Sequence, residues 1–152
     1  MRVPAFVIAL ALTLPDAAPA QQGAAGIGGA LLQNAAVTAA LAAARADEAR
    51  ALAEQVEICE VEAPPFKEAR RGALYARKFR ELGLQNVRID KVGNVLGERP
   101  GTAARPHFVL AAHLDTVFPE GTDVKTTQDG TVIRGPGIGD DCRGLAVVLA
   151  VI

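Results

Sequence analysis

This chain of 152 residues has almost no net charge, because 16 Lys and Arg stand against 17 Asp and Glu. The net charge is −1, and it stays there when residues 1–20 are set aside, since these carry only Arg2 and Asp16. Proteins that bind nucleic acid or an anionic membrane surface concentrate basic residues in one region. The balanced charge indicates neither partner, and we expect the chain to bind no nucleic acid.

Cysteine is scarce as well, with two residues, and histidine is equally rare. A structural zinc site of the cysteine-rich type needs more thiols or imidazoles than this sequence offers, so that class of site is not expected. Cys59 and Cys142 could form one disulfide in an exported protein. They lie in different predicted elements, however, and the sequence favours two free thiols that pack as small hydrophobic side chains.

A long hydrophobic run is also missing, so no transmembrane segment is predicted. Residues 1–20 combine Arg2, an apolar stretch over residues 3–14 and the sequence Ala18-Pro-Ala20, a pattern typical of a secretory signal peptide with an A-x-A cleavage site. A buried N-terminal helix is the alternative. The signal peptide predicts a secreted or periplasmic protein whose mature form begins near Gln21. At the other end, residues 145–152 form an apolar run without a helix cap, so we expect the domain to be truncated there.

Half of the residues are apolar, enough for a single domain with a hydrophobic core. Residues 21–46 are rich in Ala and Gly and predict a poorly ordered leader or a weak helix. Apolar side chains then recur at helical spacing and predict helices over residues 49–60 and 67–82, the second ending at Gly83. The basic residues of the second helix are predicted to form a solvated face rather than an anion-binding surface. They are Arg70, Arg71, Arg77, Lys78 and Arg80.

Strand patterns follow the second helix. Residues 87–90 and 95–98 predict two short strands around a turn, and residues 131–134 predict another. The near-continuous apolar run over residues 107–117 is typical of a central strand that is covered on both faces. Because helices and strands alternate, the sequence predicts an α/β sandwich.

His113, Asp115 and Asp140 are the residues most suited to chemistry. Side chains at positions i and i+2 of a strand share a face, so the Asp115 carboxylate can accept one imidazole N–H of His113 and leave the other ring nitrogen free for a cation. Asp140 follows a glycine-rich turn, at the end of the sheet where α/β proteins bind ligands. The pattern predicts His113 and Asp140 as metal ligands and Asp141 as a helix cap. The alternative is a non-catalytic exported binding domain with a packed histidine and two capping carboxylates.

The glycine turn, Gly135-Pro-Gly-Ile-Gly139, does not fit a nucleotide-binding loop. Asp140 stands where a dinucleotide loop has its third glycine, and no Lys-Ser or Lys-Thr pair follows as in a P-loop. We expect these glycines to let the backbone pass close to a metal centre instead.

The segments around His113-Leu-Asp115 and Asp140-Asp141-Cys-Arg-Gly144 resemble the N-terminal half of the catalytic domain of the M20 family of zinc-dependent metallopeptidases. In that family an H-x-D at the end of a buried strand precedes, by roughly 25 residues, a turn of the form G-x-x-D-x-K-G. The resemblance implies that His113 binds one zinc ion, Asp140 bridges two, and Asp115 is the catalytic aspartate that holds His113 without touching the metal. It also implies a cis peptide bond between Asp140 and Asp141. Cys142-Arg143 replaces the usual x-K, so the role of that lysine is not transferred.

The resemblance covers residues 47–152. It implies the N-terminal part of a three-layer α/β/α sandwich of the zinc-dependent exopeptidase type, and a secreted hydrolase that cleaves amide bonds through a water activated by two metals. Zn²⁺ is the expected cofactor, with Co²⁺ or Mn²⁺ as substitutes, and the substrate is a peptide or an N-acyl amino acid. Exopeptidase and deacylase action both remain open, and relatives form homodimers through a domain absent here. The general base and remaining ligands would lie beyond Ile152, so we expect the chain alone to be inactive.

Overall fold

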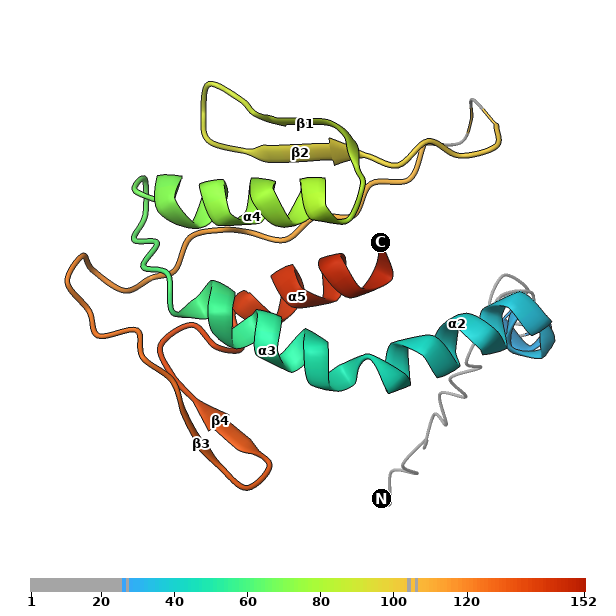
Figure 1. Cartoon of the computed structure of the whole chain (residues 1–152), viewed down its shortest axis with the longest axis horizontal. Coiled ribbons are helices and arrows are strands. Elements are labelled where there is room, and N and C mark those ends of the chain that lie inside the picture. The colour runs from blue at the N-terminus through green and yellow to red at the C-terminus, as the bar shows by residue number, and fades with distance from the viewer. Residues whose placement is uncertain (1–25, 27, 104, 106) are drawn as a thin grey trace, which may run out of the picture. The chain divides into compact units, whose positions relative to one another are not determined.

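The computed structural model describes residues 26, 28–103, 105 and 107–152, which form mixed α/β structure (Figure 1). The predicted signal peptide lies outside the described residues. The chain divides into two units, residues 1–41 and residues 42–152, and all of the candidate site belongs to the second unit. A search of the described part of the chain for a helix with the length and hydropathy of a membrane span finds none.

The Ala-rich and Gly-rich leader contains helix α2, Ala35–Ala46. Asn34 precedes it, and its side-chain Oδ1 accepts a hydrogen bond from the N–H of Ala36 at 2.9 Å, as a helix-capping amide does. None of the residues of α2 is buried. Of the two predictions for this segment, a poorly ordered leader or a weak helix, the structure has the helix over residues 35–46.

Three further helices, α3 (Glu48–Cys59), α4 (Ala69–Glu81) and α5 (Cys142–Val151), enclose the core. Figure 1 shows α5 alongside α3, and the two helices are in direct contact. The phenol of Tyr75 on α4 donates a hydrogen bond of 2.8 Å to the carbonyl of Leu145 on α5, so the buried hydroxyl is satisfied. Burial of the phenol raises the pKa of Tyr75. The central side chains of the core are Ile58, Tyr75, Phe79, Leu145 and Leu149.

Two antiparallel hairpins make up the strand content. Strands β1 (Gln85–Ile89) and β2 (Val95–Glu98) pair over α4 (Figure 1), with Ile89 opposite Val95, and they confirm two of the predicted strands. Strand β4 (Val132–Arg134) confirms a third. Its partner β3 (Thr127–Asp129) was not predicted, because three polar or charged residues show no strand periodicity.

The prediction of a central strand over residues 107–117 is wrong for the structure described here. The segment forms no ladder with any described strand, and Phe108 and Val109 remain 87% and 82% exposed. Its second half is held instead by isolated hydrogen bonds, among them that from the N–H of Thr116 to the carbonyl of Ala63 at 2.9 Å. A run of apolar residues becomes a strand only when another strand satisfies its backbone groups, and periodicity alone cannot report that partner.

The prediction that all basic residues of α4 face solvent is also wrong. Arg71 is 0% exposed and Lys78 is 6% exposed, whereas Arg70, Arg77 and Arg80 are exposed. Positions 71, 75 and 78 follow one another at helical spacing, so the two cations share the buried face of α4 with Tyr75. Each is satisfied there: Lys78 donates to Glu57 at 2.6 Å, and Arg71 donates to backbone carbonyls.

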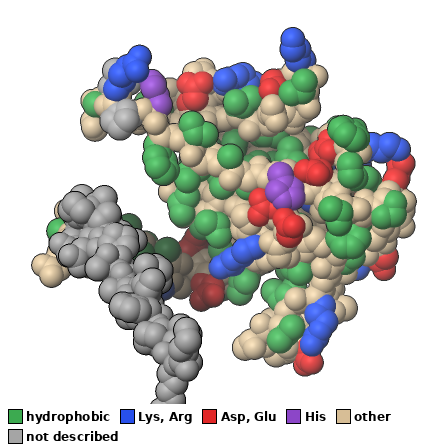
Figure 2. Space-filling model, turned by 180° about the vertical axis from the view of Figure 1, so that it is seen from behind, with side chains coloured by type: hydrophobic (Ala, Val, Ile, Leu, Met, Phe, Trp, Pro, Cys, Tyr) green, Lys and Arg blue, Asp and Glu red, His purple; other side chains and the backbone are tan. Residues whose placement is uncertain are grey.

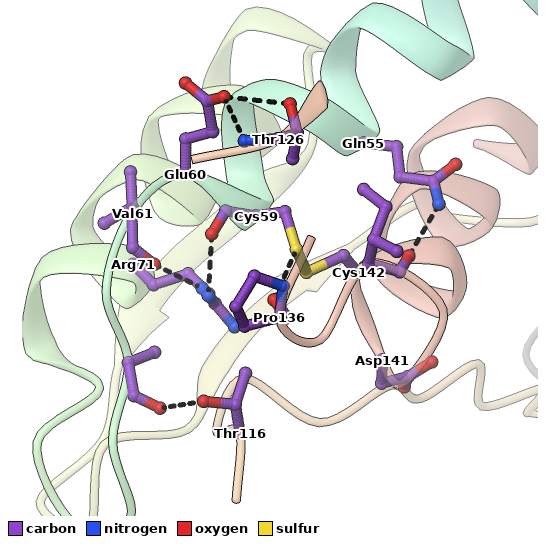
Figure 3. The surroundings of a disulfide bond; sticks show 12 residues. Gln55, Cys59, Glu60, Val61, Arg71, Thr116, Thr126, Pro136, Asp141 and Cys142 are labelled. Carbon is purple, nitrogen blue, oxygen red and sulfur yellow. Dashed lines mark hydrogen bonds between the residues drawn. A yellow bond between two sulfur atoms is a disulfide. The ribbon is translucent and has the colours of Figure 1, made fainter. Parts of the chain in front are cut away.

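The expectation of free thiols is wrong, because Cys59 and Cys142 form a disulfide (Figure 3). Both residues are buried, as predicted, at 0% exposure. The disulfide joins the last residue of α3 to the first residue of α5 across a sequence separation of 83. The sequence placed the two cysteines in different helices, and only the tertiary packing of those helices brings them together.

Glu60 anchors the segment that leads into β3. Its carboxylate accepts hydrogen bonds from the Nζ of Lys125 at 2.8 Å and from both the N–H and the hydroxyl of Thr126 at 2.9 Å. These bonds, with that from Lys125 the largest contribution, lower the pKa of Glu60 from 4.5 to about 2. A carboxylate with a lowered pKa in the folded state stabilises the fold above its ordinary pKa, and that stabilisation is lost as the pH falls toward the folded value.

We therefore expect the free energy of unfolding to fall as the pH drops from 4.5 toward 2, and to fall less steeply in Glu60→Gln. Urea unfolding measured across this pH range checks the prediction. Glu81→Gln is the matched control, because the Glu81 side chain is 61% exposed and, among the described residues, pairs only with Arg77 on the surface of α4. Equal pH slopes for the wild type and Glu60→Gln would contradict this role of Glu60.

Candidate metal centre

The side chains of His113, Asp115 and Asp140 converge as the sequence predicts. The Nδ1 atom of His113 lies 3.1 Å from Oδ1 of Asp115 and 3.0 Å from the backbone oxygen of the same residue. The Nε2 atom lies 2.8 Å from Oδ1 of Asp140. Both ring nitrogens thus face carboxylate oxygens, so each donates and the arrangement favours the protonated imidazole. A cation that replaced the Nε2 proton would leave the other proton on Nδ1, where Asp115 holds it.

The site is open to solvent. Figure 2 shows a histidine on the molecular surface with acidic side chains directly against it. The side chains of His113 and Asp115 are about half exposed, and that of Asp140 is 90% exposed. Hydrogen bonding to Asp140, and to a smaller extent to Asp115, raises the pKa of His113 against the opposing effect of desolvation. The carboxylates therefore stabilise a positive charge at this position, whether that charge is a proton or a metal ion.

Asp141 has two structural roles, one predicted and one missed. As predicted, it caps α5: its Oδ1 accepts the N–H of Gly144 at 3.0 Å. Its Oδ2 also accepts the backbone N–H of His113 at 3.0 Å, so Asp141 joins the two halves of the site. The sequence carries the capping signal but no signal for the second contact. The peptide bond between Asp140 and Asp141 is cis, as the resemblance implied.

His113, Asp140 and Asp141 form a group whose potential ligand atoms all lie within 4.8 Å of one another. Both carboxylate oxygens of Asp141 already accept backbone N–H groups. The carboxylate of Asp140 contacts only the imidazole of His113 among the described residues and otherwise faces solvent. Asp140 is therefore the better candidate ligand of the two aspartates.

The glycine turn brings this group against the H-x-D segment. Gly137 has a φ of +76°, and a Cβ atom at this position would lie 2.8 Å from Cγ2 of Thr116. Only glycine meets both conditions, because other residues rarely adopt positive φ and would collide with Thr116. The turn therefore lies close against Thr116, and the approach of its backbone to a metal centre stays a prediction.

Gly144 leaves the space that the capping carboxylate occupies. A Cβ atom at this position would overlap Oδ1 of Asp141, 2.0 Å away. Alanine normally stabilises a helix by about 1 kcal/mol relative to glycine. Here we expect Gly144→Ala to lower the free energy of unfolding by about 1 kcal/mol instead, because the cap and its bond to His113 are lost.

Urea unfolding of Gly144→Ala checks this prediction. Gly139→Ala is the matched control, because a Cβ atom there meets nothing within 4 Å and the residue does not have positive φ. The control should unfold as the wild type does. A stabilised Gly144→Ala variant would show that Asp141 does not depend on this space.

A groove of about 610 Å³ borders the site. His113 and Asp115 lie at its wall together with side chains of α4, β2 and residues 109–114. Most of these neighbours are apolar, and they include Phe66, Phe79, Val92, Val95, Leu96, Val109, Leu110 and Leu145. Concave, largely apolar surfaces with a few polar groups are typical of sites for small molecules and peptides.

Comparison of the chain with models of known protein families gives no match, and comparison with curated proteins also gives none. The function of the chain is therefore inferred from the geometry of His113, Asp115 and Asp140.

Proposed function

We propose that His113 and Asp140 are zinc ligands and that the chain is part of a zinc-dependent hydrolase of the M20 type, acting on the amide bonds of peptides. The observation that carries this proposal is the 2.8 Å separation between Nε2 of His113 and Oδ1 of Asp140. Two ligand atoms that each lie roughly 2.0–2.2 Å from one tetrahedral zinc ion are separated by about 3.4 Å, so a small outward movement of either side chain from the 2.8 Å contact would admit the metal. The approach of the two side chains is therefore of the kind that a shared metal needs.

Each residue has a distinct part in the proposed reaction. His113 and Asp140 hold the metal, and Asp115 is a positioning residue that fixes the tautomer and orientation of the imidazole. A bound zinc ion supplies a water of lowered pKa and polarises the scissile carbonyl. The open side of Asp140 and the adjoining groove leave room for a substrate beside the metal.

The number of ligands sets the expected strength of binding. A catalytic zinc ion takes three protein ligands and a water, whereas this site offers His113 and Asp140. We propose that the chain binds zinc weakly and shows no turnover by itself, as the N-terminal part of a larger α/β/α sandwich. The disulfide between Cys59 and Cys142 supports export to an oxidising compartment, where such bonds persist.

The proposal is tested by titrating the full chain with Zn²⁺ and following the heat of binding. We expect His113→Ala and Asp140→Asn each to weaken binding at least tenfold, because each variant removes one of two ligands. His107→Ala is the matched control, since His107 is the other histidine, is exposed, and lies outside the site. Absence of zinc binding by the wild type, or equal affinity in His113→Ala and the wild type, would overturn the proposal.

A further inference from the structure

Arg71 is a buried cation whose hydrogen bonds all go to backbone carbonyls. Its Nε donates to Val61 at 2.9 Å, its Nη1 to Leu114 at 2.7 Å and its Nη2 to Cys59 at 3.3 Å. Figure 3 shows the guanidinium beside the end of α3. Burial of a charge is unfavourable unless its donors are used, and desolvation lowers the pKa of Arg71 accordingly. The side chain thus joins two segments of backbone, residues 59–61 and the segment around Leu114, at the cost of burying its charge.

One of these two is the centre of the H-x-D segment. Leu114 stands between His113 and Asp115, so a fixed Leu114 carbonyl fixes the peptide groups on which both side chains depend. None of the described strands pairs with this segment, so no backbone ladder restrains it. Arg71 and the Thr116 contacts with Ala63 supply the missing restraint from the interior.

The other segment contains Cys59, which is also bonded covalently to the Asp140 segment. Cys59 accepts a hydrogen bond from Arg71 through its carbonyl and forms the disulfide to Cys142 through its sulfur. Cys142 directly follows Asp141 in the chain. Gln55 on α3 makes a second contact between α3 and the segment before Asp140, because its Nε2 donates to the carbonyl of Ile138 at 2.6 Å (Figure 3).

Leu114 is therefore linked to Cys142 through the hydrogen bonds of Arg71 to Leu114 and Cys59 and through the Cys59–Cys142 disulfide. These links connect the two segments that carry the proposed metal ligands. We propose that Arg71 and the Cys59–Cys142 disulfide act as one clamp that holds His113 and Asp140 at ligand distance. The geometry of the clamp is independent of metal, and its consequence for zinc affinity rests on the proposed function. Residues that orient metal ligands from behind typically change metal affinity tenfold to a hundredfold when replaced.

The clamp is tested with two variants, Arg71→Lys and the double variant Cys59→Ala/Cys142→Ala, in the full chain. Lysine keeps the positive charge, which favours folding of this variant. Its single ammonium group cannot reach three carbonyls at once, so the clamp is weakened. Two quantities are measured: hydrogen exchange of the His113 amide in metal-free protein, and Zn²⁺ affinity. The His113 amide reports assembly of the site because it donates to Asp141. Leu149→Ala is the control for general loss of stability, since Leu149 is buried in the core and makes none of the side-chain bonds of the clamp.

We expect both clamp variants to speed exchange of the His113 amide about tenfold and to weaken zinc binding about tenfold or more. Leu149→Ala should leave zinc affinity within about twofold of the wild type. Unchanged exchange in either clamp variant, or an equal loss of zinc affinity in Leu149→Ala, would overturn the clamp. Faster exchange in the clamp variants of a protein that binds no zinc would leave the clamp standing and reject the proposed function.

Discussion

Replacing both Cys59 and Cys142 by alanine is expected to lower the free energy of unfolding by about 4 kcal/mol. The disulfide spans a sequence separation of 83, and closing a loop of that length restricts the unfolded chain by about 4 to 5 kcal/mol in the chain-entropy account. Domains of this size are stable by about 5–15 kcal/mol. The change would therefore remove a large part of the stability of the second unit.

Urea unfolding of the oxidised wild type and the double variant measures this loss. The single variants Cys59→Ala and Cys142→Ala serve as controls, because either one breaks the same covalent link and should lose nearly as much as the double variant. A double variant that loses less than about 1 kcal/mol would contradict the expectation, since the loop-closure contribution would then be absent.

The helices of the second unit could be predicted because their signals are local. Pro64-Pro65 ends the α3 region, and Gly83, with a φ of +77°, follows α4 where the sequence placed the end of a helix. Apolar spacing between these markers was sufficient to locate both helices. The β1–β2 hairpin was predictable for the same reason, because the turn and both strands lie within a few residues of one another.

Features that depend on distant partners could not be predicted. The segment over residues 107–117 has the composition of a central strand, but strand formation also requires a neighbouring backbone. Arg71 looked like part of a solvated basic face, whereas its carbonyl acceptors come from Cys59, Val61 and Leu114. Periodicity shows which residues share a helix face, and it does not show which face the rest of the chain will cover.

The candidate site also combines features that local sequence signals predict with contacts between distant segments that they do not predict. The pair of His113 and Asp115 follows from the i and i+2 spacing, which places both side chains within reach of each other in extended backbone. Asp140 was predicted from its position after the glycine turn and from the family resemblance. The contact of Asp141 with the His113 amide and the disulfide behind the site join segments far apart in the sequence, so no local pattern indicates them.

Zinc affinity is expected to fall as the pH is lowered through the pKa of His113. Hydrogen bonds to Asp140 and then Asp115 raise this pKa above its ordinary value of 6.5. A metal binds the neutral imidazole, so a proton on Nε2 competes with it, and each pH unit below the pKa weakens binding by about tenfold. Because the pKa is raised, this competition begins at a higher pH than it would for an unperturbed histidine. In the metal-free protein the sign is opposite: the protonated histidine stabilises the fold fully below pH 6.5, and this contribution is lost as the pH rises through the raised pKa.

Asp115→Asn separates these effects because it removes one carboxylate while keeping both zinc ligands. We expect the variant to bind zinc more weakly than the wild type at about pH 8, where orientation of the imidazole by Asp115 is the main difference. Its loss of affinity should begin at lower pH, because fewer negative charges favour protonation of His113. The two affinities should therefore converge as the pH falls in a series of Zn²⁺ titrations from about pH 8 to about pH 5.5. A constant ratio between them across the series would show that Asp115 does not influence the protonation of the proposed ligand.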